Sequence, residues 1–284
     1  MTEMENKHWG KRKLLQFIAF GCSNLHGFNL GTGKLYEGKW KKFCHPGLNC
    51  YSCPAASFAC PIGAMQAVSG SMNFKFSFYV AGLLLAFGTI FGRAVCGWLC
   101  PFGLLQELIH KIPSPKIGLK KGFLNVKYII LAVFVILLPI TATNYMGMGK
   151  PAFCQYICPA GTLEGGLFLL STHGELRQTI GPLFGLKAGI LAATIVGSVL
   201  IYRFFCRVLC PLGAIYGFMN RFSMCHLEVD HHRCTLCGAC KKACGMEVDP
   251  VKAPDSMECI RCGNCVKACP SGAVYMGFRN KGQA

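Results

Sequence analysis

The apolar positions of this chain are concentrated in four stretches, which polar and glycine-rich segments separate. The stretches are Leu14–Leu30, Phe74–Gly92, Tyr128–Met146 and Leu183–Phe205. A helix needs about 20 apolar residues to cross the hydrocarbon core of a bilayer, and the second and fourth stretches reach that length. The third contains Pro139, which membrane helices tolerate, and the first is interrupted by Asn24 and His26. The pattern predicts an integral membrane all-α domain with about four transmembrane helices.

The composition fits a membrane-embedded body with a smaller polar part. Only 14% of the 284 residues are charged, whereas soluble domains average about 25%. We therefore expect a polar tail over residues 1–13, a membrane domain over residues 14–222 and a separate C-terminal domain over residues 223–284.

Basic residues beside the apolar stretches predict the orientation, because they favour the cytoplasmic side. They occur in the N-terminal tail, between the second and third stretches and after the fourth: Lys7, Lys11, Arg12, Lys13, Lys111, Lys116, Lys120, Lys121, Arg203 and Arg207. The loop before the second stretch is also basic, with Lys34, Lys39, Lys41 and Lys42, and so argues against this orientation. We expect a multi-pass protein of the cytoplasmic membrane, in contact with lipid, with both termini and the C-terminal domain inside.

A Cys-Pro-x-Gly motif occurs four times, which indicates an internal duplication. Its cysteines are Cys60, Cys100, Cys158 and Cys210, and the last three follow a further cysteine by four residues: Cys96, Cys154 and Cys206. Six residues after each motif cysteine stand Gln66, Gln106, Glu164 and Tyr216. Each half, residues 44–113 and residues 144–222, contains one such motif, a membrane stretch and a second motif.

The Cys-Pro pair is suited to binding an iron–sulfur cluster. Proline favours the first position of a helix, so the preceding cysteine lies at the helix N-terminus, where free N–H groups and the helix dipole stabilise an anion. Four thiolates complete the ligand set of a [4Fe–4S] cluster. We predict that Cys96, Cys100, Cys206 and Cys210 hold a cluster at the inner membrane face; the competing interpretation is that these cysteines only pack in the helices.

The remaining cysteines of the membrane domain predict a fourth cluster, at the outer face. Its expected ligands are Cys53, Cys60, Cys154 and Cys158. Two alternatives stay open: disulfides among Cys44, Cys50, Cys53 and Cys60, which an oxidising compartment would permit, or a cluster held by those four loop cysteines alone.

The C-terminal domain carries two tandem cysteine runs with the spacing of a bacterial two-cluster ferredoxin. The runs are Cys234, Cys237, Cys240 and Cys244, followed by Cys259, Cys262, Cys265 and Cys269. In this arrangement the fourth cysteine of each run binds the other cluster. We therefore predict one [4Fe–4S] cluster on Cys234, Cys237, Cys240 and Cys269, and another on Cys259, Cys262, Cys265 and Cys244, in a ferredoxin-like α+β fold.

The formal charge of +17 would also suit a nucleic-acid-binding protein. A [4Fe–4S] cluster with four thiolates carries a charge of about −2, so several clusters would offset much of the excess. The basic residues also flank apolar stretches, where they contact anionic lipid. These features argue against nucleic acid as a partner.

The four stretches, the motifs at Cys96–Pro101 and Cys206–Pro211, and the double run Cys234–Pro270 together resemble a known family. This family comprises the membrane ferredoxins of the periplasmic nitrate reductase system (NapH type) and the nitrous oxide reductase accessory proteins (NosR type). The resemblance implies an electron-transfer subunit of the quinol dehydrogenase type. The cysteines Cys44, Cys50, Cys53, Cys60, Cys154 and Cys158 depart from its pattern and suggest further metal sites.

These features predict a membrane-bound polyferredoxin that relays electrons. Its expected partners are quinone and redox proteins of the ferredoxin, cytochrome or reductase type. No residue set for catalysis beyond electron transfer is predicted. The alternative is a redox-sensing or maturation factor, which would change its partner binding without sustained electron flux.

Overall fold

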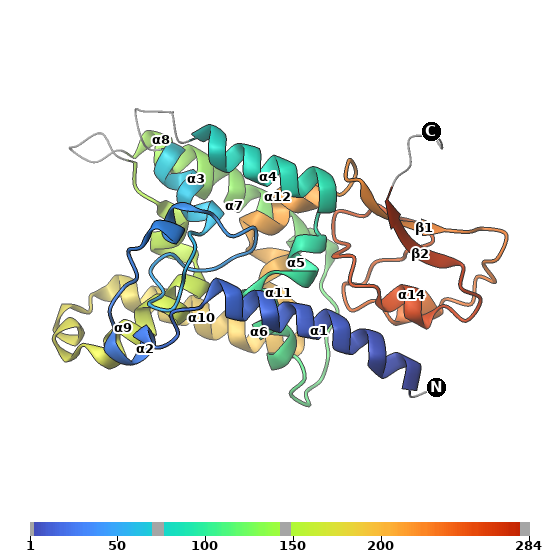
Figure 1. Ribbon diagram of the computed structural model, residues 1–284, viewed down its shortest axis with the longest axis horizontal. Coiled ribbons are helices and arrows are strands. Elements are labelled where there is room, and N and C mark those ends of the chain that lie inside the picture. Colours follow the sequence, from blue (N-terminus) through green and yellow to red (C-terminus); the bar gives the residue numbers. More distant parts are fainter. Residues whose placement is uncertain (1–2, 70–76, 143–148, 279–284) are drawn as a thin grey trace.

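The computed structural model describes residues 3–69, 77–142 and 149–278. It shows a helical body with a small C-terminal module at one end (Figure 1). The helix α1 lies along the body, and it begins at the same end of the molecule as the module (Figure 1).

The body consists of helices and short helical turns. In the first half these are α1 (Glu3–Ser23), α2 (Asn29–Thr32), η1 (Lys39–Lys42), α3 (Pro61–Ser69), α4 (Ser77–Phe91), α5 (Ala94–Trp98) and α6 (Pro101–Ile109). A continuous apolar helix follows, made of η3 (Lys121–Asn125), α7 (Val126–Ile130), η4 (Leu131–Leu137) and α8 (Leu138–Thr141). The second half contains η5 (Phe153–Ile157), η6 (Gly161–Leu167), α9 (Phe168–Thr172), η7 (Gly174–Thr179), α10 (Pro182–Leu200), α11 (Phe204–Val208) and α12 (Pro211–Met219).

The Cys-Pro motifs mark helix starts, as their sequence predicts. Helices α3, α6 and α12 begin at the prolines Pro61, Pro101 and Pro211. Cys100 and Cys210 are the N-caps of α6 and α12 and have extended backbone conformations, with φ/ψ of −73°/117° and −78°/112°. Proline fixes its own φ at the helical value and disfavours helix at the residue before it, so the chain turns sharply at each cysteine.

Among the described residues, two helices are long and apolar enough to cross a membrane: Lys121–Thr141 and Pro182–Leu200. Only 22% of the apolar stretch of the first helix and 17% of that of the second are buried, so most of these side chains face outward. They correspond to the predicted third and fourth stretches; residues 143–146 of the third lie outside the described residues.

The other two predicted spans differ from the expectation. The stretch Leu14–Leu30 is not one helix, because α1 ends at Ser23 and turns separate it from α2. Arg12 and Gln16 of α1 are buried against the body, so this helix packs as an amphipathic element. Helix α4 has 15 residues, short of a full span, and residues 74–76 lie outside the described residues.

The C-terminal module has the predicted α+β character. Strands β1 (Cys225–Val229) and β2 (Val274–Phe278) pair antiparallel, with Cys225 opposite Phe278. Two short helices, α13 (Ala239–Lys242) and α14 (Asn264–Ala268), each follow a glycine with positive φ. The chain between the two strands contains both cysteine runs. The buried core of the module is formed by Leu227, Cys240, Cys265 and Val274.

Candidate iron–sulfur sites and their connections

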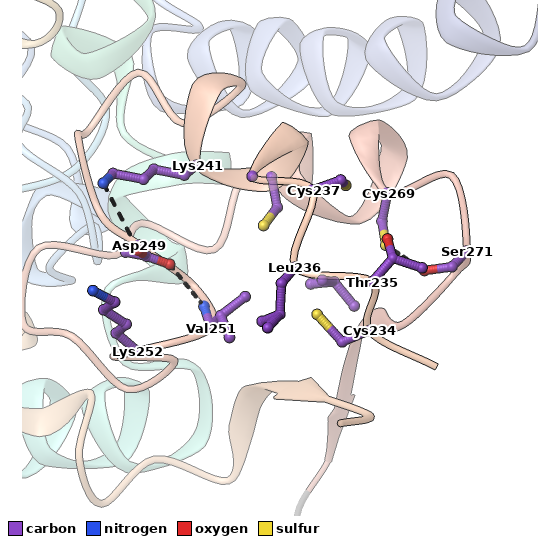
Figure 2. A pocket seen from close by; sticks show the side chains of 13 residues that line it. Cys234, Thr235, Leu236, Cys237, Lys241, Asp249, Val251, Lys252, Cys269 and Ser271 are labelled. Atoms are coloured by element: carbon purple, nitrogen blue, oxygen red, sulfur yellow. Dashed lines mark hydrogen bonds and ion pairs between the residues drawn. The ribbon is translucent and has the colours of Figure 1, made fainter. Parts of the chain in front are cut away.

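The first site is formed by Cys234, Cys237, Cys240 and Cys269, which line one cavity of about 260 Å³ (Figure 2). Burial tends to raise the pKa of Cys269, but hydrogen bonds from Ser271 and from backbone N–H groups lower this pKa below its ordinary value. Such donors stabilise a thiolate, which is the form that binds iron. The structure thus brings together the four residues that the ferredoxin spacing assigns to one cluster.

The second site is formed by Cys244, Cys259, Cys262 and Cys265, which line a second, tighter cavity in the module. Burial raises the pKa of Cys265 to about 12, and the charges of Cys262, Cys259 and Cys244 add to that shift. The four thiols are therefore mutual neighbours. Cys244 and Cys269 each lie with the run to which they do not belong in sequence, which is the exchange that the two-cluster spacing predicts.

The third site, in the helical body, is formed by Cys96, Cys100, Cys206 and Cys210. All four are at most 5% exposed. Burial raises the pKa of Cys100 to about 12, and the neighbouring charges of Cys206 and Cys96 contribute. Cys210 likewise has a raised pKa, from burial first and then from Cys206, Cys96 and Cys100. The two halves of the duplication each supply one Cys-x₃-Cys pair.

The surroundings of the third site carry an excess of buried positive charge. Glu107 pairs with Arg12, Lys13 and Arg203. Glu258 pairs with Arg93 and Lys127. Five cations thus share two carboxylates, and Arg93 and Arg203 also donate to the carbonyls of Cys206 and Cys96 at 2.8 and 2.6 Å. Buried charge needs compensation, and an anionic cluster on these four thiolates would supply it.

The fourth site contains Cys50, Cys60, Cys154 and Cys158, which line a cavity of about 660 Å³. Burial raises the pKa of Cys60 to about 12, with Cys154 as the next cause. A side chain at Gly161 would meet the sulfur atoms of Cys50 and Cys158 at 3.7 and 3.8 Å. Cys44 lines the same cavity, but the charges that add to the effect of burial in raising the pKa of Cys158 are those of Cys154, Cys50 and Cys60. These four neighbouring thiols, with glycine leaving room between them, fit the ligand set of a [4Fe–4S] cluster.

The lining of this cavity differs from the expected ligand set, because it includes Cys50 and not Cys53. Cys53 packs in a separate small cluster with Ala55 and Ala56 and does not line the cavity. In the first half of the duplication Ala56 stands four residues before Cys60, where the other motifs have cysteine. The loop supplies the missing thiol from Cys50 instead. All twenty cysteines, which lie within the described residues, are free thiols in the structure.

Two glutamines repeat the same contact at the third and fourth sites. Gln106 donates to Cys206 Sγ at 3.1 Å, and its carbonyl accepts from Phe205 N at 3.0 Å. Gln66 donates to Cys154 Sγ at 3.2 Å, and its carbonyl accepts from Phe153 N at 2.9 Å. The sequence showed that Gln66 and Gln106 have equivalent positions but did not show that they donate to cysteine sulfur atoms. Their repeated position, six residues after a motif cysteine, was the signal that could have indicated this role.

The equivalent residues of the second half hold the loop before Cys53. Glu164 Oε2 accepts from the Cys50 N–H at 2.9 Å, and Tyr216 donates to the Pro46 carbonyl at 2.9 Å. Burial raises the pKa of Glu164 to about 7, which the Cys50 N–H opposes.

The module is joined to the body beside the second and third sites. Asn220 donates to the Cys259 carbonyl at 2.7 Å, and its own oxygen accepts from Arg93 N at 2.7 Å. Trp98, two residues after Cys96, donates to the Arg261 carbonyl at 2.9 Å. The second site therefore abuts the helices that carry the third.

Within the described residues, no three His, Cys, Asp or Glu side chains are arranged to chelate a single metal ion. A cubane makes a different demand, because each of its four thiolates binds a different iron atom and the sulfur atoms lie farther apart.

Comparison with known proteins agrees with this arrangement. A family of 4Fe-4S binding domains matches residues 57–79, 76–120, 128–173 and 185–225, which is more than half of the chain. The chain belongs to this family. A second 4Fe-4S binding domain family matches residues 253–275, in the module.

The relatives have modest similarity, and some of them are named as electron transport or ferredoxin-type proteins. An uncharacterized protein of Methanocaldococcus jannaschii is 31% identical over 175 residues, 60% of this chain and 65% of the relative. The putative electron transport protein YccM of Escherichia coli is 27% identical over 206 residues, 62% of this chain and 52% of the relative. The methylamine utilization ferredoxin-type protein MauN of Methylorubrum extorquens is 26% identical over 251 residues, 84% of this chain and 75% of the relative.

The predicted resemblance is thereby confirmed: this is a polyferredoxin of the NapH and NosR type. The chain spans between half and two thirds of the length of the first relatives. No solved structure matches it.

Proposed function

We propose that this polyferredoxin is a membrane-bound electron carrier whose four sites form a series from the module into the helical body. A [4Fe–4S] cluster in each site would accept and release single electrons. The observation that carries the proposal is the junction of the second and third sites, where Asn220 and Trp98 of the body bind the backbone at Cys259 and Arg261. The first site is lined by residues of the module alone.

The two apolar helices support the membrane location. A core helix of a soluble protein is mostly buried, whereas Lys121–Thr141 and Pro182–Leu200 expose most of their apolar side chains. Exposed apolar surface of this extent is stabilised by lipid and is rare on soluble proteins. Helix α1 begins at the same end of the molecule as the module (Figure 1). This arrangement supports an orientation in which both lie on the cytoplasmic side.

An apolar cavity of about 320 Å³ between α1, α5 and β2 is our candidate quinone site. It is lined by Leu15, Ala94, Trp98 and Phe278, among others, and lies beside the third site through Val95, the neighbour of Cys96. The apolar, membrane-soluble ring of a quinone fits such a lining. We expect Ala94→Phe to fill the cavity and slow reduction of the protein by a quinol, while reduction by dithionite is unchanged.

Iron quantitation after anaerobic purification tests the proposal. We expect about 16 iron atoms per chain, four for each [4Fe–4S] site. The double variant Cys96→Ser, Cys206→Ser should lose about four of them. Cys22→Ser is the control, because this exposed cysteine belongs to none of the four sites. A wild-type content of about eight would confine the clusters to the module and contradict the proposal.

A further inference from the structure

The third and fourth sites are separated by one short loop, which we call the bridging loop (residues 44–50). It lies in the core of the body, where Leu48 and Asn49 are 2% and 1% exposed. Cys44 forms a parallel bridge with Ala59, and His45 N donates to the Ala59 carbonyl at 3.0 Å. A loop buried to this extent, with its backbone groups held on both sides, has a defined path between the two halves of the duplication.

The backbone of the bridging loop faces both groups of cysteines. Gly47 lies against Cys100 of the third site, where a Cβ atom at residue 47 would be 2.9 Å from the Cys100 Cα atom. Leu48 and Asn49, which follow it, line the cavity of the fourth site. Consecutive Cα atoms are about 3.8 Å apart, so one residue separates the part of the loop at the third site from the part at the fourth. The sites expected at opposite membrane faces are thus neighbours within the body, because the loop between them is buried rather than external.

Gly47 brings the loop against the third site. A Cβ atom at this position would lie 2.9 Å from the Cα atom of Cys100 and 3.0 Å from the His45 ring. Contact with backbone at this distance cannot be relieved by a side-chain rotation, so only glycine permits the approach. The Gly47 N–H donates to His45 Nδ1 at 2.9 Å, which fixes the loop in this conformation.

We propose that the bridging loop is the electron-transfer connection between the third and fourth sites and that Cys50 is the fourth ligand of the latter. The inference rests on the proposed function. Cys50 is joined to Gly47 by three peptide bonds, so a ligand of the fourth site reaches the residue that contacts Cys100 of the third site through covalently bonded backbone.

Iron content tests the ligand assignment, with a matched pair of variants. Cys50→Ser should lose about four iron atoms per chain, the content of one [4Fe–4S] site. Cys53→Ser, three residues away in the same loop region, should keep the wild-type content. Loss in Cys53→Ser without loss in Cys50→Ser would overturn the assignment.

Spin–spin splitting in the EPR spectrum of the fully reduced protein tests the connection. We expect Gly47→Ala to keep its iron and to show a weaker splitting between the third and fourth sites, because the added Cβ moves the loop away from Cys100. Gly189→Ala is the control, since a Cβ there meets nothing within 4 Å.

Tyr216→Phe provides a second, milder variant in case Gly47→Ala does not fold. It removes the hydroxyl that donates to Pro46, and we expect a weaker splitting with unchanged iron. Unaltered splitting in both iron-replete variants would overturn the connection alone. A wild-type protein with clusters only in the module would refute the proposed function, and the inference with it.

Discussion

Two buried glutamines tune the sulfur ligands of the body. Gln106 and Gln66 each donate one hydrogen bond to a cysteine sulfur. Such a bond stabilises the reduced, more negative form of a cluster and so raises its reduction potential. A net hydrogen bond of about 1 kcal/mol corresponds to roughly 40 mV for one electron.

We therefore expect Gln106→Leu to lower the reduction potential of the third site by about 40 mV. Redox-titrated EPR measures the shift. Gln66→Leu should act on the fourth site and leave the third unchanged. A potential of the third site that does not move in Gln106→Leu would contradict the role of this hydrogen bond.

Glu107 holds three buried cations in place. It accepts hydrogen bonds from Arg12, Lys13, Arg203 and Tyr202. Burial tends to raise the pKa of Glu107, but the charges of Arg203 and Arg12 hold this pKa below its ordinary value. Removing one partner of a buried ion pair leaves charge uncompensated, which costs about 3–5 kcal/mol.

Glu107→Gln should therefore destabilise the body by several kcal/mol, read as a lower thermal unfolding midpoint in detergent. The control is Asp230→Asn, because Asp230 pairs with Arg233, whose side chain is 72% exposed. Exposed pairs contribute about 1 kcal/mol or less. Equal effects of the two substitutions would contradict the buried network.

Single residues also mark where sequence reasoning succeeded and where it stopped. The spacing of Cys234 to Cys269 determines which thiols meet, because short runs wrap one cluster locally. The sequence could not distinguish Cys50 from Cys53 as a residue of the fourth site. Four residues before Cys60, where the other motifs have a cysteine, this chain has Ala56. Closeness in sequence alone does not determine which thiol of a long loop faces the cavity. That choice depends on the contacts of Glu164 and Tyr216, from the other half of the chain.

At the scale of elements, the helix starts were predictable and the spans were only partly so. Proline determines its backbone conformation locally, so the starts at Pro61, Pro101 and Pro211 follow from sequence. Hydropathy does not distinguish lipid contact from packing between helices. Helix α1 is apolar after Lys13, yet its buried Arg12 and Gln16 bind the body through Glu107 and the Gly97 carbonyl.

The contact between α12 and the module is the element junction that we expect to control docking. Asn220, at the end of α12, donates to the carbonyls of Ser256 and Cys259. Asn220→Ala removes both donors and should leave buried acceptors unsatisfied, at about 1–3 kcal/mol each. We expect faster amide hydrogen exchange across residues 256–262, with unchanged exchange in α10. Exchange that stays at the wild-type rate would show that other contacts suffice for docking.

At the scale of the whole molecule, the proposed membrane location depends on the outward-facing side chains of α10. Leu186 and Val196 are 54% and 59% exposed. A lysine near the centre of a spanning helix costs about 2.5–3.5 kcal/mol. The double variant Ala192→Lys, Ala193→Lys, at exposed positions near the centre of α10, should therefore be lost from membranes on alkaline extraction. Leu236→Lys, at an exposed position of the module, is the control and should be retained.

The order in which the chain is made has a consequence for how the sites are filled. Each site draws its ligands from distant segments, and its last cysteine decides when it is complete. During synthesis from the N-terminus the fourth site is completed at Cys158, the third at Cys210, the second at Cys265 and the first at Cys269. The sites deepest in the body are thus available to the iron–sulfur assembly machinery before the module that would cover the third site has emerged from the ribosome.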